Sequence, residues 1–113
     1  MGGRSSGDGI SVTARIDGTI NEVTLLNNIT TNNGIFGVDV DDTSALGSIL
    51  SAQLTRNSVF NNASRDVRVD LDGGELNAEN NYWGTAAGLL PAEVLLQDGS
   101  TIDADPFLTS DPN

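Results

Sequence analysis

The side chains that could do chemistry in this sequence are almost all acidic. Sixteen aspartates and glutamates stand against five arginines, giving a net charge of -11, and the chain has no lysine, histidine or cysteine. Imidazole catalysis, thiolate chemistry and His/Cys zinc sites are therefore excluded. A strongly negative chain also repels phosphate groups, so we expect no nucleic-acid partner. Carboxylates, arginines and hydroxyl groups remain as the available chemistry.

Two carboxylates, Asp41 and Asp70, occupy equivalent places in the similar segments VDVD and VRVD, 29 residues apart. If these segments lie side by side as strands, the two aspartates repel each other unless a cation or partial protonation relieves them. Calcium, which takes several oxygen ligands, would suit Asp41, Asp70 and the neighbouring Asp42. The same alignment sets Asp39 beside Arg68 as an opposite-charge pair. The alternative is a solvated acidic face with an incidental ion pair.

A two-carboxylate glycosidase site is a further alternative. Retaining enzymes hold their carboxyl groups about 5–5.5 Å apart, which is close to the spacing of neighbouring strands. Adjacent acids on any pair of stacked strands meet that distance, and Tyr82 and Trp83 belong to another segment of the chain. The spacing alone therefore does not identify an enzyme.

The elements that must position these groups repeat along the chain. A short strand-like alternation returns at residues 10–12, 38–40, 67–69 and 94–96, in steps of 28, 29 and 27. A second strand-like triplet follows each of them, at residues 23–25, 52–54, 76–78 and 102–104. Two series in phase indicate a chain that winds into parallel coils, in which each strand pairs with its counterpart one coil away.

Asparagines recur in the same phase. Asn28, Asn57 and Asn81 each come three residues after a second triplet, and Asn32 and Asn61 follow four residues later. Asparagines stacked at a bend can bond backbone groups and pass a hydrogen bond to the next coil, so we expect an asparagine ladder at these five positions. The alternative is that they are only turn residues.

The sequence resembles the right-handed parallel β-helix repeat proteins of the pectate-lyase-like superfamily. The resemblance rests on GISVTARIDGTI, NNITTNNGIFGVDV and RNSVFNN, and above all on NNYWGTAAGLLP followed by STIDADPFL, which look like closing turns of such proteins. It implies an all-β fold, a right-handed parallel β-helix of about four coils. It also implies that Trp83, in phase with Thr30 and Val59, fills the interior near the last coil.

Lyases of this superfamily hold calcium on outward acidic residues and abstract a proton with an arginine or lysine, which by resemblance gives Arg68 the catalytic role. The chain departs from them because it is short, has no lysine and lacks long loops to wall a sugar cleft. We therefore expect a noncatalytic structural or binding module, part of a larger surface or secreted repeat protein. The alternative is a calcium-dependent polysaccharide lyase or a glycoside hydrolase-like protein acting on polysaccharide.

The organisation expected is a flexible leader at residues 1–8 and one domain at residues 9–113, closed by residues 85–113. No apolar run is long enough to span a membrane, and the resemblance favours an extracellular or cell-surface location. Pro106 and Pro112 blunt the C-terminal end of the coil stack, whereas the first coil has no such cover. We therefore expect self-association through the N-terminal coil.

Overall fold

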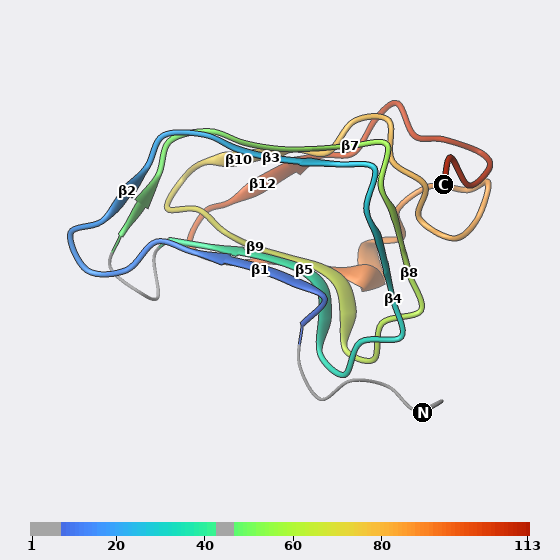
Figure 1. The fold of residues 1–113 in the computed structure, drawn as a ribbon, viewed down its shortest axis with the longest axis horizontal. Coiled ribbons are helices and arrows are strands. Elements are labelled where there is room, and N and C mark those ends of the chain that lie inside the picture. Colours follow the sequence, from blue (N-terminus) through green and yellow to red (C-terminus); the bar gives the residue numbers. More distant parts are fainter. Residues whose placement is uncertain (1–7, 43–46) are drawn as a thin grey trace.

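The computed structural model describes residues 8–42 and 47–113, and residues 1–7 of the predicted leader lie outside this range. The described chain winds as a parallel β-solenoid of about three turns (Figure 1). It contains strands and one short 3-10 turn, η1 (Pro91–Glu93), which begins at a proline as such turns often do. No helix in this part of the chain has the length and apolar character needed to cross a membrane.

One long side of the solenoid carries the first series of strands. Its order is β1-β5-β9-β11, and every neighbouring pair is parallel. The strands are β1 (Ile10–Thr13), β5 (Phe36–Asp41), β9 (Arg65–Asp70) and β11 (Val94–Leu96). Val40 pairs with Val12 on one side and with Val69 on the other, so the register predicted from the repeat is confirmed.

The opposite long side carries the second series, in the order β12-β10-β7-β3. Two short sheets, β2 with β6 and β4 with β8, join the long sides at the two ends of the cross-section (Figure 1). These strands are β2 (Thr19–Ile20), β3 (Val23–Leu26), β4 (Ile29–Thr31), β6 (Ser48–Ile49), β7 (Ala52–Thr55), β8 (Ser58–Phe60), β10 (Glu75–Asn77) and β12 (Thr101–Asp103).

The sequence predicts about four coils, and this number is too high. Each long sheet has four strands, but each short sheet has only two. Beyond β8 the stacking continues as one isolated bridge from Ser58 to Tyr82, after which residues 84–93 leave the regular path. The last circuit therefore lacks its short sides, and about three turns are complete.

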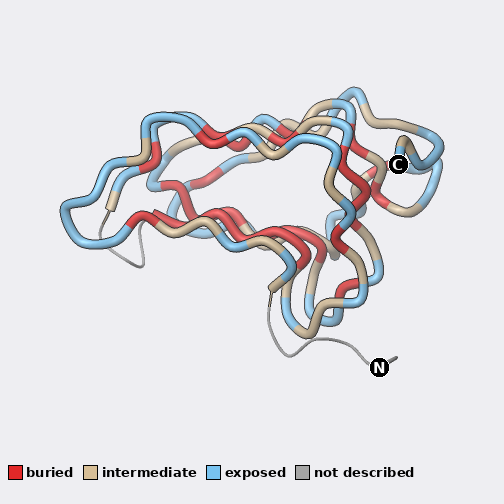
Figure 2. Tube along the Cα trace, viewed as in Figure 1, coloured by how far each residue is buried: buried red, intermediate tan, exposed pale blue. Residues whose placement is uncertain are grey.

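The core consists of small aliphatic side chains that alternate along the long strands. Val38, Val40, Val67 and Val69 are at most 1% exposed, and they face the second sheet, whose buried residues include Leu54. Figure 2 shows buried segments recurring at matching places on successive turns. A strand presents every second side chain to the same face, so the valine alternation that defines the repeat also fills the interior.

Trp83 packs in the same core and is 4% exposed. It directly follows Tyr82, which bridges to Ser58, so it comes level with Val59 and Thr30, as the sequence predicts. The segment after it closes the C-terminal end. Phe107 packs against the core, and Leu108 donates its N–H to the carbonyl of Asn81 at 2.9 Å. These contacts continue the stacking over the last bend without another strand.

The bends between the long sheet of β3 and the short sheet of β4 share one backbone conformation. In successive turns, the residue before the bend asparagine has a positive φ of 57° to 63°; these residues are Asn27, Arg56 and Asn80. Asparagine tolerates this left-handed conformation better than most residues, whereas Arg56 takes it without that advantage. The turn of backbone at each of these positions directs the next residue into the stack.

Candidate functional site

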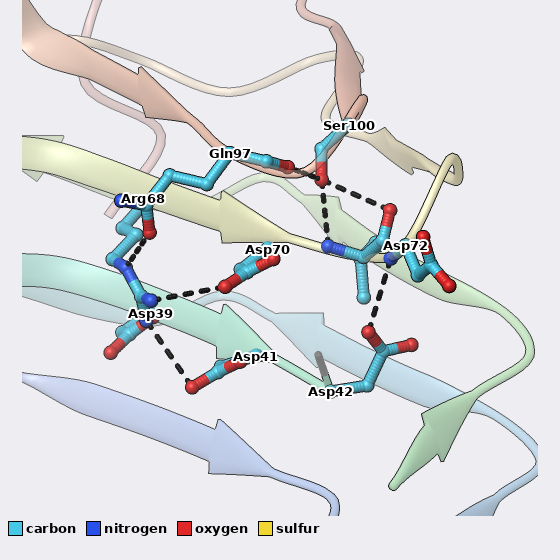
Figure 3. A network of polar contacts seen from close by, with 9 residues as sticks. Asp39, Asp41, Asp42, Arg68, Asp70, Asp72, Gln97 and Ser100 are labelled. Atoms are coloured by element: carbon cyan, nitrogen blue, oxygen red, sulfur yellow. Dashed lines mark hydrogen bonds and ion pairs between the residues drawn. The ribbon is translucent and has the colours of Figure 1, made fainter. Parts of the chain in front are cut away.

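Three of the acidic residues singled out by the sequence, Asp39, Asp41 and Asp70, meet around one arginine on the outer face of the first long sheet (Figure 3). Arg68 Nη1 lies 2.9 Å from Asp39 Oδ1 and 3.4 Å from Asp41 Oδ2. Arg68 Nη2 lies 3.2 Å from Asp70 Oδ2, and Nε donates to Gln97 Oε1 at 2.8 Å. The predicted pair of Asp39 and Arg68 is confirmed, and the same guanidinium reaches both aspartates that were expected to repel each other.

The cluster is enclosed although it lies on the outer face. The side chain of Arg68 is 15% exposed and that of Asp70 only 2%. Burial alone would lower the pKa of Arg68, but the hydrogen bond and charge of Asp39, followed by Asp41, raise it above its ordinary value. Burial raises the pKa of Asp39, and the hydrogen bond from Arg68 opposes part of that rise. The arginine is thus held as a cation and is a poor proton acceptor.

Asp42, the third aspartate of the predicted calcium set, serves the backbone of the neighbouring turns. Its Oδ2 accepts from Ile49 N at 3.0 Å, and its Oδ1 accepts from Asp72 N at 3.1 Å (Figure 3). In residues 8–42 and 47–113, no group of three or more acidic side chains is arranged to hold a metal ion. The arrangement therefore suits a guanidinium better than calcium, and calcium binding by Asp41, Asp42 and Asp70 stays a prediction.

Three of the predicted ladder residues form a hydrogen-bonded column. Asn57 Oδ1 accepts from Asn28 N at 2.8 Å and from Asn28 Nδ2 at 3.0 Å. Asn81 Oδ1 accepts from Asn57 N at 2.9 Å and from Asn57 Nδ2 at 3.0 Å. The Nδ2 atom of Asn57 also donates to the carbonyl of Leu25 at 2.8 Å. Each side chain thus bonds the backbone and the side chain of an adjacent turn.

At the next bend the side-chain column runs through Asn33 and Asn62, one residue after the predicted Asn32 and Asn61. Asn62 Oδ1 accepts from Asn33 N at 3.1 Å and from Asn33 Nδ2 at 2.9 Å. Asn32 and Asn61 instead have a φ of 58° and stack through a backbone hydrogen bond of 3.2 Å. The sequence held a signal for this shift of one residue, because in the Asn27-Asn28 doublet it is also the second asparagine whose side chain joins the column.

A pocket of about 320 Å³ lies where the chain turns from β8 into β9, and sequence reasoning missed it. Its lining comes from the second bend, from the start of β9, and from the segment between Trp83 and η1. The residues that matter to its chemistry are Phe60, Asn62, Asp66, Trp83, Leu90 and Glu93. Only Trp83 among them was singled out from the sequence, and it was assigned to the core.

Asp66 is the most perturbed group of this pocket. It is 3% exposed, and its Oδ1 accepts from Asn62 Nδ2 at 3.0 Å. Burial raises the pKa of Asp66 to about 6; the hydrogen bonds from Asn62 act in the opposite direction, and the charge of Glu93 adds to the rise. The Nε1 atom of Trp83 is buried without a hydrogen-bond partner among the described residues. A buried acid with a perturbed pKa in the lining of a pocket makes that pocket a candidate binding site.

Comparison with known proteins leaves the resemblance to rest on the sequence motifs alone. No protein-family model matches the chain, and neither a curated protein nor a solved structure matches it significantly. The fold is accordingly a parallel β-solenoid, and membership of the pectate-lyase-like superfamily stays a proposal.

Proposed function

We propose that the protein is a noncatalytic structural or binding module that pairs with a second copy through its first turn. We further propose that its turns wind in the right-handed sense of the pectate-lyase-like superfamily, to which its closing segment NNYWGTAAGLLP is similar. The observation that carries the proposal is the edge of the first turn. Within the described residues 8–42 and 47–113, all four of its strands, β1, β2, β3 and β4, lie at the end of their sheets.

An unpaired strand edge offers N–H and C=O groups to another chain. On β3, Val23 N donates to Ser51 O at 2.9 Å and Asn27 N donates to Thr55 O at 3.3 Å. Because hydrogen-bonding directions alternate along a strand, the N–H of Thr24 points away from β7 and toward the open edge. This strand therefore supports pairing with a second chain.

Apolar side chains accompany this edge. Ile16, Leu26 and Ile29, all from the first turn, are 70%, 52% and 61% exposed. Contact with a second copy would remove part of this surface from water, at about 25 cal/mol for each Å² buried. Two copies related by a two-fold axis would cover both open edges at once, and this is the commonest symmetry of homo-oligomers.

The state of Arg68 weighs against a lyase. A lyase of this type needs a base that can accept a proton, whereas three carboxylates hold Arg68 as a guanidinium. Among the described residues there is also no acidic group of three that would hold the calcium of such an enzyme. These features favour a module whose acidic face is structural.

Sedimentation velocity across a salt series tests the proposal. A net charge of -11 opposes contact between copies, so the dimer should strengthen as salt screens the repulsion. A strict monomer at high protein concentration in both low and high salt would contradict it. An assay on polyuronides for unsaturated products tests the enzymatic alternative. Sustained product formation that is lost in Arg68→Gln would establish a carbohydrate-active enzyme and contradict the noncatalytic module.

A further inference from the structure

The pocket between β8, β9 and η1 is separate from the first-turn edge and from the Arg68 cluster, and it has the features of a ligand site. Its volume of about 320 Å³ is at the lower end of small-molecule pockets. It is built from three segments of the chain that are held together by defined contacts. One of these is the hydrogen bond of 3.0 Å from Arg65 Nη1 to Val94 O, which ties β9 to the strand after η1.

The charge of the pocket selects a cation. Asp66 and Glu93 line it, and no lysine or arginine does. Asp66 is buried, its Oδ1 is bonded to Asn62, and no partner for its Oδ2 is found among the described residues. A buried carboxylate with a free oxygen and a second carboxylate nearby is stabilised by a positively charged donor between them.

The lining also includes carbon surface, interspersed with uncharged polar side chains. Phe60, Ala63, Leu90 and the buried Trp83 contribute the carbon surface, and Asn61, Asn62 and Thr85 contribute polar groups. A hydrated metal ion gains nothing from the carbon surface, and two carboxylates by themselves do not complete the oxygen shell of calcium. An ammonium group that carries a short alkyl chain uses both halves, since its N–H groups bond the carboxylates and its carbons pack against the rings.

We propose that this pocket binds a small primary alkylamine, with its ammonium group between Asp66 and Glu93 and its alkyl chain against Phe60 and Leu90. The volume leaves room for an amine of roughly four to six carbons. This proposal does not depend on self-association, because the pocket lies between the second turn and the third, whereas the proposed dimer uses the first.

Fluorescence provides a readout at the site itself, because Trp83 is the single tryptophan of the chain. The probe is butylammonium chloride, titrated at neutral pH with total ionic strength held constant by sodium chloride. We expect a saturable change in Trp83 emission in the millimolar range, as befits a ligand of about five non-hydrogen atoms. Absence of any saturable change up to about 100 mM, a concentration well above that range, would overturn the proposal.

Three matched probes define the chemistry. Butan-1-ol has the same chain without the charge, tetramethylammonium has the charge without N–H groups, and calcium chloride is a cation without an apolar part. Each should bind at least tenfold more weakly than butylammonium, because each lacks one half of the recognition. Equal binding of butan-1-ol would show a merely apolar pocket, and tighter binding of calcium or tetramethylammonium would show a different cation site; each of these results contradicts the proposal.

Variants locate the ligand. Glu93→Gln, on a short surface turn, and Asp66→Asn, which keeps the shape of the side chain, should each weaken butylammonium binding at least tenfold. Glu75→Gln on β10 is the control, because Glu75 is an exposed acid that does not line the pocket. If Asp66→Asn folds poorly, Glu93→Gln alone decides. Unchanged affinity in Glu93→Gln would overturn the proposed position of the ammonium group.

Discussion

Asp41 and Asp70 lie opposite each other on β5 and β9, and the guanidinium of Arg68 forms an ion pair with each of them. Both aspartates are buried, at 6% and 1% exposure, on a face that a bare strand would leave in water. The repulsion expected from their pairing is relieved inside the chain by a neighbouring side chain. The outer acidic face is therefore part of what holds the turns together.

Replacing this internal cation should destabilise the fold. Arg68→Gln leaves Asp39, Asp41 and Asp70 without their common partner, and we expect a loss of about 3 kcal/mol in the free energy of unfolding. Urea denaturation measures it, with Arg15→Gln as the control because Arg15 is exposed. A loss no larger than that of the control would mean that the cluster is merely surface charge.

Calcium distinguishes a structural cluster from a metal site. We expect the wild-type protein to melt at the same temperature in millimolar calcium and in chelator, because Arg68 already supplies the cation. Arg68→Gln should acquire a calcium-dependent rise in melting temperature, and adding Asp70→Asn to it should abolish that rise. A rise in the wild type that Asp70→Asn removes would instead support a calcium site at Asp41, Asp42 and Asp70.

The asparagine column should contribute measurably to stability. Asn57→Ala removes the acceptor of Asn28 N and the donor to Leu25 O, so we expect a cost of about 1–3 kcal/mol. Thermal and urea unfolding measure this cost against Asn21→Ala, whose side chain is exposed. If the two variants are equally stable, the bend asparagines are only turn formers.

The register of the long sheets could be predicted because it follows from local chemistry repeated at a nearly fixed step. The alternation VDV, VRV and VLL marks strands, and copies 29 and 27 residues apart fall into register when strands stack in parallel. Asn28, Asn57 and Asn81 could be predicted for the same reason. Their offset from a strand is constant, so one geometry serves every turn.

The remaining features depend on choices that a single sequence leaves open. Asn32-Asn33 and Asn61-Asn62 are doublets, and only the backbone conformation decides which member turns inward. The pocket around Asp66 arises because residues 84–93 leave the regular path and bring Glu93 close to β9. An irregular segment has no counterpart in the repeat, so neither its contacts nor the true number of complete turns could be deduced.

The burial of Asp66 should appear in the pH dependence of stability. Its pKa in the folded state is raised to about 6 from 3.8, so the folded state binds its proton more tightly than the unfolded state. This group therefore makes stability fall as pH rises from about 4 to about 6, by up to about 3 kcal/mol. Asn62 and the carboxylate of Glu93 are the groups that act on it.

Asp66→Asn cannot ionise, so we expect it to gain stability relative to the wild type across this window and to keep the gain at pH 7. Denaturant unfolding at a series of pH values measures the difference, with Glu75→Gln as the exposed control. A difference between Asp66→Asn and wild type that does not change between pH 4 and pH 7 would show that Asp66 titrates normally.

The claim that the first turn is an association surface is tested most directly at Thr24. Thr24→Pro removes both the side-chain hydroxyl and the backbone N–H that points to the open edge. Thr24→Val removes the hydroxyl but keeps the N–H, so it is the matched control. Sedimentation velocity at high salt compares the two with the wild type. We expect a dimer for the wild type and for Thr24→Val, and a monomer with unchanged circular dichroism for Thr24→Pro. A dimer of equal strength in all three proteins would contradict it.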